Sequence, residues 1–228
     1  MITLSPRLAM VAGLTREGNV LTDIGTDHAY LPATLILEGR IPSAIAADVR
    51  KGPLSNAEET IRKYGLEEQI TTVLSDGFAA LTPGVSHDFV LAGMGGNLIT
   101  DLMAAADWIQ EPGNHFVLQP QSHAEDLRQY LSENGFTILR ETAVEEPRHV
   151  YLAMEVEYTG IREQLTPSQY YIGKLKDADC PAKYTYYNMV TDRLIKRLDA
   201  LLQVEGAKEE CDLLTQIITD IKETTHGT

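Results

Sequence analysis

Four segments of this chain carry acidic residues, glycines or both at places where buried strands are expected to end. Carboxylates at such positions accept hydrogen bonds from hydroxyl and amino groups, and glycines let the backbone approach a ligand closely. Together these segments predict a site for an adenosine-like molecule without a phosphate. The segments are Asp23-Ile-Gly-Thr-Asp-His-Ala-Tyr-Leu-Pro32, the strand end at Asp48, Ser75-Asp76-Gly77 and Ala92-Gly-Met-Gly-Gly-Asn97.

Two of the carboxylates suit the two parts of an adenosine. Asp48, at the end of the second expected strand, can accept hydrogen bonds from both hydroxyls of a ribose. Asp76, at the end of the third, can accept one from an adenine amino group. Each is also typical of an ordinary turn, so neither decides the matter alone. The chain has no G-x-G-x-x-G motif, which disfavours a nicotinamide or flavin nucleotide.

The segment after the fourth expected strand holds three glycines within four positions, at 93, 95 and 96. Glycines at this point remove side chains where two ligands could meet, at a cost in chain entropy. A structural tight turn is the alternative explanation. The segment therefore predicts either the reacting centre or a sharp turn.

A mostly parallel sheet is needed to bring these strand ends to one edge. Short apolar runs predict strands over residues 19–25, 44–49, 70–74, 88–92 and 115–118, with helices over 30–38, 52–64, 97–106 and 123–134. Ser5 and Pro6 are typical of the start of an earlier helix, which Gly13 ends. Parallel strands joined by helices imply a sheet covered on both faces.

The end of the chain departs from this alternation. Two β-rich runs over 136–141 and 149–158 are joined by a short link at 145–147, which predicts a reversed, antiparallel hairpin at one edge. After Gly160 the pattern is helical, with a break at Gly206. We expect an α/β domain over residues 1–160 and a helical hairpin domain over 161–228. The apolar face of the hairpin is predicted to contain Val190, Leu194, Leu198, Leu201, Leu214, Ile217 or Ile218, and Ile221.

The charge of the chain is acidic and unevenly distributed. Its 228 residues include 19 Lys and Arg against 33 Asp and Glu, a net charge of -14, which argues against a general polyanion binder. Most of the excess acid precedes residue 161. Arg193, Lys196 and Arg197 in the near-neutral tail leave room for a local basic surface, whose affinity for a polyanion would fall with salt.

Other features exclude several classes of protein. No apolar run approaches the length of a membrane span, and the amino terminus lacks the pattern of a signal peptide, so we expect a cytoplasmic protein with no membrane partner. Cys180 and Cys211 have no Cys or His partner at ligand spacing. They predict neither a disulfide framework nor a metal site.

These motifs together resemble a class I S-adenosylmethionine-dependent methyltransferase and, more narrowly, the bacterial tRNA adenine-22 N1-methyltransferase family. The resemblance spans the chain and is densest over residues 21–120. It implies a Rossmann-like methyltransferase sheet, a C-terminal helical coiled-coil domain that helps to grip tRNA, S-adenosylmethionine as cofactor, and methyl transfer to N1 of an adenine in tRNA. The motifs that carry it are residues 23–32, Gly52-Pro53, Ala92-Gly-Met-Gly-Gly96, Leu118-Gln-Pro120 and the helical tail.

The resemblance also assigns roles to individual residues. The cofactor-binding residues it implies are Asp23, Gly25, His28, Asp48, Asp76, Gly77, Ala92 and Gly93. The residues it places at the reacting centre are Asp27, His28, Tyr30, Gly93, Met94 and Gly95. Adenine N1 carries an in-plane lone pair, so the reaction needs in-line positioning and a dry site rather than a strong base.

Alternative functions and partners stay open at this point. The same scaffold can serve a methyltransferase acting on a small molecule or a protein, or a catalytically inactive scaffold that binds the cofactor or RNA. The leucine and isoleucine face of the helical tail favours a core or homodimer contact over an RNA contact. Tyr184, Tyr186 and Tyr187 could stack on RNA bases, or they could be packed in the core.

Overall fold

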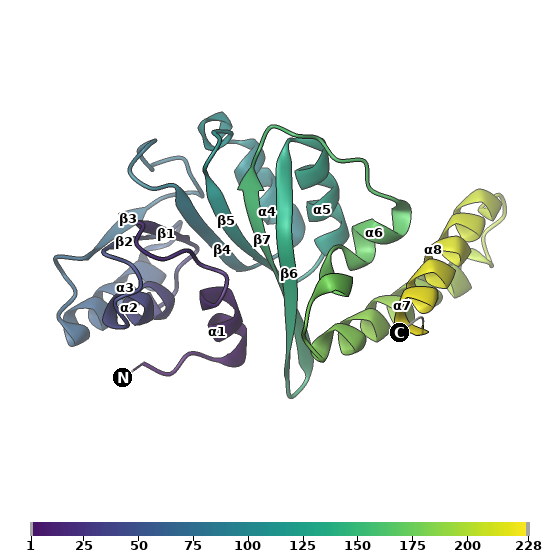
Figure 1. Cartoon of the computed structure of the whole chain (residues 1–228), viewed down its shortest axis with the longest axis horizontal. Helices are drawn as coiled ribbons and strands as arrows, with labels where there is room; N and C mark the ends of the chain where they lie inside the picture. Colours follow the sequence, from purple (N-terminus) through teal and green to yellow (C-terminus); the bar gives the residue numbers. More distant parts are fainter. Residues whose placement is uncertain (1, 227–228) are drawn as a thin grey trace.

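The computed structural model describes residues 2–226 and contains a seven-stranded sheet in the order β3-β2-β1-β4-β5-β7-β6 (Figure 1). The first five strands are parallel, and β6 and β7 form an antiparallel hairpin at the edge next to β5. The predicted fold class is confirmed. The strands are β1 (Leu21–Ile24), β2 (Ala44–Asp48), β3 (Ile70–Leu74), β4 (Asp88–Met94), β5 (His115–Pro120), β6 (Phe136–Glu146) and β7 (His149–Tyr158).

Helices cover both faces of the sheet, as parallel strands require (Figure 1). One buried cluster joins the sheet to the first three helices, and a second joins it to α4, α5 and the C-terminal helices. Alternation along β4 separates them, since Val90 belongs to the first and Phe89 and Leu91 to the second. The helices are α1 (Pro6–Ala12), α2 (Tyr30–Leu37), α3 (Lys51–Tyr64), α4 (Gly96–Ala104) and α5 (Ala124–Glu133).

Local sequence features begin and end these helices where expected. The Ser5 hydroxyl accepts a hydrogen bond from the backbone N–H of Leu8, Pro6 is the first residue of α1, and Gly13 follows its last residue. Gly65 ends α3 with a φ of 67°, a conformation that favours glycine. These boundaries depend on nearby residues and were predictable from sequence.

The antiparallel hairpin is longer than predicted. Strand β6 continues to Glu146, five residues beyond the predicted end, because Glu145 and Glu146 pair with Val150 and His149 of β7. These two glutamates therefore lie in the strand rather than in the link. The hairpin tip projects past the other strands and lies beside the start of helix α7 (Figure 1), where the Thr185 hydroxyl donates a hydrogen bond to Glu145.

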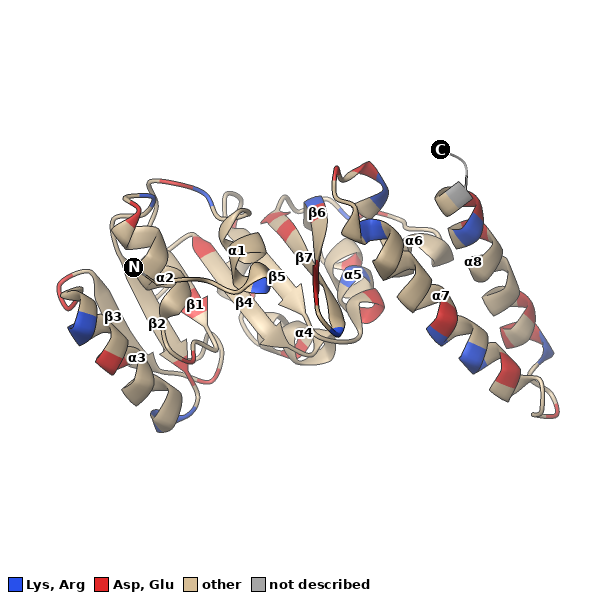
Figure 2. Cartoon of the chain, turned by 90° about the horizontal axis from the view of Figure 1, so that it is seen from below, with Lys and Arg blue, Asp and Glu red and all other residues tan. Residues whose placement is uncertain are grey.

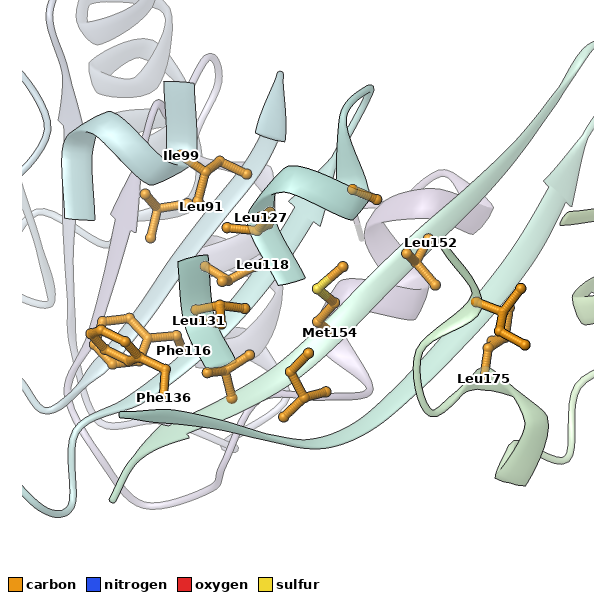
Figure 3. Packing of buried hydrophobic residues seen from close by; sticks show 14 of the residues in the cluster. Leu91, Ile99, Phe116, Leu118, Leu127, Leu131, Phe136, Leu152, Met154 and Leu175 are labelled. Carbon is orange, nitrogen blue, oxygen red and sulfur yellow. The ribbon is translucent and has the colours of Figure 1, made fainter. Parts of the chain in front are cut away.

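The C-terminal segment consists of α6 (Pro167–Ile172), α7 (Ala182–Leu201) and α8 (Lys208–His226). Helices α7 and α8 pair through the predicted apolar face, and their buried residues join the cluster beneath α4 and α5. Figure 3 shows the sheet part of this cluster, with Leu118 and Met154 facing Leu127 of α5. Tyr186 and Tyr187 are buried in the same cluster, so they pack rather than stack on a ligand. The division at residue 160 remains a prediction.

A buried ion pair fastens the C-terminal segment to the sheet. Arg128 of α5 and Glu141 of β6 are both fully buried, with Arg128 Nε 2.8 Å from Glu141 Oε1. Arg128 also donates to the carbonyl oxygens of Tyr170 and Tyr171 at 2.7 and 2.8 Å, and Glu141 accepts the backbone N–H of Lys174. One pair of charges therefore connects three separate parts of the chain.

The charged residues of the tail are mixed in sign. Blue and red segments are interspersed along α7 and α8 (Figure 2). Arg193 pairs with Glu125 at 2.9 Å, and Arg197 pairs with Glu210 at 2.5 Å. Two of the three basic residues predicted to form a local basic surface are thus held by acidic neighbours.

Candidate functional site

The predicted site residues from four strands line one edge of the sheet. Strands β3, β2, β1 and β4 are neighbours in that order and parallel, so their carboxyl ends lie side by side. Asp76, Asp48, Gly25 and Gly93 follow or end these strands in the same order. The loop after β1 is held against β2 by hydrogen bonds from the backbone N–H groups of residues 25 and 26 to the Ala47 carbonyl oxygen, at 2.8 and 3.0 Å.

Asp23 is a buried acid near the centre of this edge. Burial raises the pKa of its carboxyl to about 6, and the nearby negative charge of Asp48 adds to the shift. Within residues 2–226 no Lys or Arg forms an ion pair with Asp23. A cationic group of a ligand placed beside it would therefore be strongly favoured.

Asp48 is buried and oriented by its own turn. Its Oδ1 accepts a hydrogen bond from the backbone N–H of Arg50 at 2.7 Å, and the exposed Arg50 side chain brings Nε to 3.7 Å from the same oxygen. Asp76, by contrast, is exposed, while Gly77 beside it is buried. The Ser75 hydroxyl donates to the Gly77 carbonyl oxygen at 2.8 Å and fixes this turn.

Two of the predicted glycines have conformations that require glycine. Gly25 has a φ of 80°, and a Cβ there would lie 2.1 Å from Met94 Cε. Gly93 has a φ of 83°, and a Cβ there would lie 3.4 Å from Arg7 Nη1. The backbone therefore comes close to neighbouring groups at both strand ends. Met94 is half-buried and fills the space that Gly25 leaves open.

The segment after Gly25 carries a buried hydroxyl and an exposed ring pair. The Thr26 hydroxyl is buried, and its interaction with the Asp23 carboxyl partly lowers the pKa that burial raises. The rings of His28 and Tyr30 stack in parallel, with centroids 4.9 Å apart and planes 7° apart, and Tyr30 is 41% exposed. Asp27 Oδ2 lies 3.6 Å from His28 Nε2. The segment thus offers a buried hydroxyl to one ligand and an aromatic surface to another.

The structure adds two residues for which sequence reasoning gave no role. Gln119 is completely buried at the end of β5, and its Oε1 accepts hydrogen bonds from the backbone N–H of Gly93 at 3.1 Å and from Arg7 Nη1 at 2.9 Å. Arg7 and Gln119 therefore hold the glycine segment. A glutamine inside an otherwise apolar strand was the available sequence signal for one of them; Arg7 had none.

The site also contains two strained residues that are not glycine. Ala29 and His123 have φ values of 52° and 54°, and each immediately precedes a helix at the site edge, α2 and α5 respectively. Such conformations cost about 1–2 kcal/mol for an ordinary residue. Their position beside the Gly25 and Gly93 segments indicates that the surrounding packing fixes the backbone there.

Comparisons with known proteins agree with this geometry. The profile of a family described as methyltransferase domain matches residues 4–154. The chain is 29% identical over 232 residues to the tRNA (adenine(22)-N(1))-methyltransferase of Bacillus subtilis, which covers 97% of each chain. This chain therefore belongs to the methyltransferase family whose profile it matches. The resemblance predicted from the strand-end motifs is thereby confirmed.

Two solved structures of methyltransferases extend the match to nearly the whole chain. The Bacillus subtilis M1A22 tRNA methyltransferase has a TM-score of 0.87 at 26% identity and covers 99% of this chain and 100% of its own. A Streptococcus pneumoniae protein, provisionally assigned as a tRNA (m1A22) methyltransferase, is 32% identical with a TM-score of 0.84, over 98% of this chain and 100% of its own. The latter structure is a complex with S-adenosyl-L-methionine.

The methyltransferase fold and the described residues fit that cofactor. S-adenosylmethionine carries positive charge, for which the buried Asp23 carboxylate has no competing cation, and it carries hydroxyl and amino donors that suit Asp48 and Asp76. Within residues 2–226 no group of three or more His, Cys, Asp or Glu is placed to hold a metal ion. None of the described helices is long and apolar enough to cross a membrane.

Proposed function

We propose that this methyltransferase transfers the methyl group of S-adenosylmethionine to N1 of adenine 22 in tRNA. The observation that carries the proposal is the row of acidic residues and glycines along β3-β2-β1-β4, in a chain that matches tRNA (adenine-22 N1)-methyltransferases over nearly its full length. We assign the cofactor to the β1–β3 side of this row and the target adenine to the Gly93–Gly95 segment.

The residues on the β1–β3 side bind and orient the cofactor in this proposal. Asp23 and the Thr26 hydroxyl hold the methionine part, Asp48 accepts from the ribose hydroxyls, and Asp76 accepts from the adenine amino group. Gly25 and Gly77 shape the turns that carry these groups, because each has a positive φ and the place of a Cβ is taken by Met94 or Leu102. Their backbone conformation would be strained in any other residue.

The Gly93–Gly95 segment after β4 and the loop after β1 together position the target base. When bound, S-adenosylmethionine supplies a methyl group on a positively charged sulfur, and the N1 lone pair attacks it without prior loss of a proton. The His28–Tyr30 ring pair stacks on the base, and Gln119 fixes the Gly93 backbone beside it. Asp27 offsets the positive charge of the methylated adenine. N1 lies on the pairing edge, so the base must be unpaired when it binds.

The test uses purified protein, labelled S-adenosylmethionine and tRNA that lacks the modification. We expect methylation of the wild-type tRNA and none of a tRNA with guanine at position 22. Gly93→Arg and Asp76→Arg are expected to abolish transfer. If the folded, cofactor-bound protein methylates no tRNA, the proposal fails, and transfer to a protein or a small molecule would support one of the alternative methyltransferase functions.

The remaining partner assignments are also proposals. In this proposal, helix α7, which packs on the β6–β7 hairpin, and helix α8, which pairs with α7, contact tRNA beyond the target nucleotide. The apolar faces of these helices already pack on one another and on the sheet, so a homodimer would have to use their remaining surface. Sedimentation velocity with and without tRNA tests whether such a homodimer forms. A cytoplasmic location follows from the proposed tRNA substrate and is tested by fractionation.

A further inference from the structure

A cavity of about 550 Å³ lies beside the proposed reacting centre and has no role in the mechanism above. Its walls come from three parts of the chain: residues 120–125 after β5, residues 145–152 at the tip of the β6–β7 hairpin, and residues 185–193 of α7. Its volume is within the range of sites that enclose a ligand of nucleotide size. The residues that line it do not include Gly93–Gly95, His28 or Tyr30.

The cavity shares a wall with the glycine segment. The backbone N–H of Gln121 donates to the Met94 carbonyl oxygen at 2.7 Å, and the N–H of Gly96 donates to the Ser122 carbonyl oxygen at 2.7 Å. A Cβ on Gly95 would lie 3.3 Å from Ser122 Oγ. A polymer with one unit at Gly93–Gly95 therefore has its next unit within reach of the cavity.

Most charged side chains of the cavity already have a hydrogen-bond or ion-pair partner within the described residues, and one does not. Glu145 accepts a hydrogen bond from Thr185, Glu146 accepts one from the backbone N–H of Arg7 at 3.0 Å, and Arg193 forms an ion pair with Glu125 at 2.9 Å. Arg148, at the exposed turn of the hairpin, has no partner within residues 2–226. Its guanidinium keeps its donors for an external oxyanion such as a phosphate.

The cavity also has an aromatic wall. His149 and Tyr151 project from the same face of β7, with ring centroids 5.7 Å apart. The Arg7 guanidinium carbon lies 5.7 Å from the centre of the Tyr151 ring, and Met189 of α7 is 46% exposed across the cavity. Flat rings beside a cation and a flexible apolar side chain are a typical surface for stacking a nucleobase.

We propose that this cavity binds the nucleotide next to the target adenine in the tRNA, with its base against His149 and Tyr151 and its phosphate at Arg148. The inference rests on the proposed function and assigns a second subsite to the same reaction. The neighbouring nucleotide is favoured over the target itself because the cavity adjoins the glycine segment without including it. The hairpin, longer than predicted, and α7 together build this subsite.

The experiment compares Arg148→Ala and His149→Ala with Arg162→Ala as matched control. Arg162 is also exposed, but it follows the last residue of β7, at the amino ends of the parallel strands and away from the cavity. Methylation kinetics and tRNA binding are measured with unmodified tRNA and with tRNAs carrying an abasic site on either side of the target adenine. Cofactor affinity, measured by calorimetry, checks that every variant is folded.

We expect Arg148→Ala to raise KM for tRNA about tenfold and to reduce the slope of log affinity against log salt by about one, as for one lost phosphate contact. An abasic site on one side should weaken binding about tenfold in the wild type and much less in His149→Ala. Arg162→Ala and all cofactor affinities should change less than twofold.

The inference is overturned if Arg148→Ala matches Arg162→Ala, or if neither abasic site weakens binding to the wild type. Failure of the proposed function looks different, because the wild type itself would then methylate no tRNA. In that case the comparison of tRNA binding between the same variants still decides whether the cavity binds a nucleotide. A wild type that neither binds nor methylates tRNA refutes both.

Discussion

The two sides of the sheet edge present their ligand-facing groups in different ways. On the β1–β3 side, each group lies in the last residues of a strand or in the turn directly after it: the buried Asp23 lies within β1, Asp48 ends β2, and Asp76 follows β3. On the β5 side, the cavity is assembled from a strand end, a hairpin tip and a distant helix. In the proposed function, the first side receives a small molecule and the second receives part of a larger one.

Under the proposed function, this difference lets one scaffold bind both a cofactor and a tRNA. Turns after parallel strands are held by the sheet, so their backbone is already positioned for a cofactor. The cavity on the β5 side exists only while α7 packs against the hairpin. The buried Arg128–Glu141 pair supports this packing, because Arg128 also binds the backbone of α6, which precedes α7. Changes on the β1–β4 side should therefore alter chemistry, and changes at the anchor should alter stability.

The largest expected effect is on chemistry. Gly93→Arg places a long cation at the proposed reacting centre, at a φ of 83° and close to Arg7 Nη1. We expect the methylation rate to fall more than about 1000-fold, since even small misplacement of the reacting groups costs about 100-fold. Gly84→Arg is the matched control, with a φ of 79° and open space around it, and should retain activity within twofold. Comparable activity in both variants would remove Gly93 from the reacting centre.

The next effect is on stability. Arg128→Met leaves Glu141 charged and fully buried, so the free energy of unfolding should fall by about 3–5 kcal/mol. Arg197→Met removes the exposed pair with Glu210 and should cost less than about 1 kcal/mol. Urea unfolding of both variants measures the difference. A loss below about 1 kcal/mol for Arg128→Met would show that the pair does not fasten the tail.

Gln119→Leu tests the contact by which the end of β5 holds the Gly93 backbone of β4. It leaves Arg7 and the Gly93 N–H without their buried acceptor, at a cost of about 1–3 kcal/mol. We expect kcat to fall roughly tenfold, with KM for S-adenosylmethionine changed less than threefold, because Gln119 positions the glycine segment rather than the cofactor. Gln129→Leu, at an exposed glutamine on α5, is the control. An equal fall in kcat for both variants would contradict a positioning role.

The smallest expected effect concerns pH. The pKa of Asp23 is raised to about 6, so the carboxyl is mostly ionised at pH 7 and about nine-tenths protonated at pH 5. If the ionised form binds the cationic cofactor, affinity for S-adenosylmethionine should weaken about tenfold over that interval. Calorimetry at the two pH values should show no such change for Asp23→Asn, whose overall affinity is lower. A wild-type affinity independent of pH would exclude Asp23 as the cation partner.

The same acid has a predictable effect on folding. Because its folded pKa lies above the usual value of 3.8, the folded state holds a proton that the unfolded state has released between about pH 4 and 6. Asp23 alone therefore makes the fold less stable as pH rises through this window, and Asp23→Asn removes that contribution. If Asp23 binds the cationic cofactor as proposed, cofactor binding should offset this loss of stability at neutral pH.

The parts of the fold that depend on neighbouring residues were predictable. Apolar runs followed by turns located β1 to β5, and the Ser5 cap and Gly65 marked helix ends. Parallel pairing predicted that the acidic strand ends share one edge, whereas the order of the strands came only from the structure. The length of β6 was missed because Glu145 and Glu146 look like loop residues, although pairing with β7 keeps them in the strand.

Sequence alone determined the alternating elements, the acidic and glycine-rich strand ends and the family resemblance. These features depend on the spacing of apolar residues and on turn-forming residues, which are properties of neighbouring positions in the chain. Only the tertiary structure decided that Arg7 and Gln119, 112 positions apart, meet at Gly93. It also decided that Arg128 meets Glu141 in the core, and that the hairpin tip and α7 enclose a cavity. Contacts between distant segments leave no local pattern, since they depend on how whole layers pack.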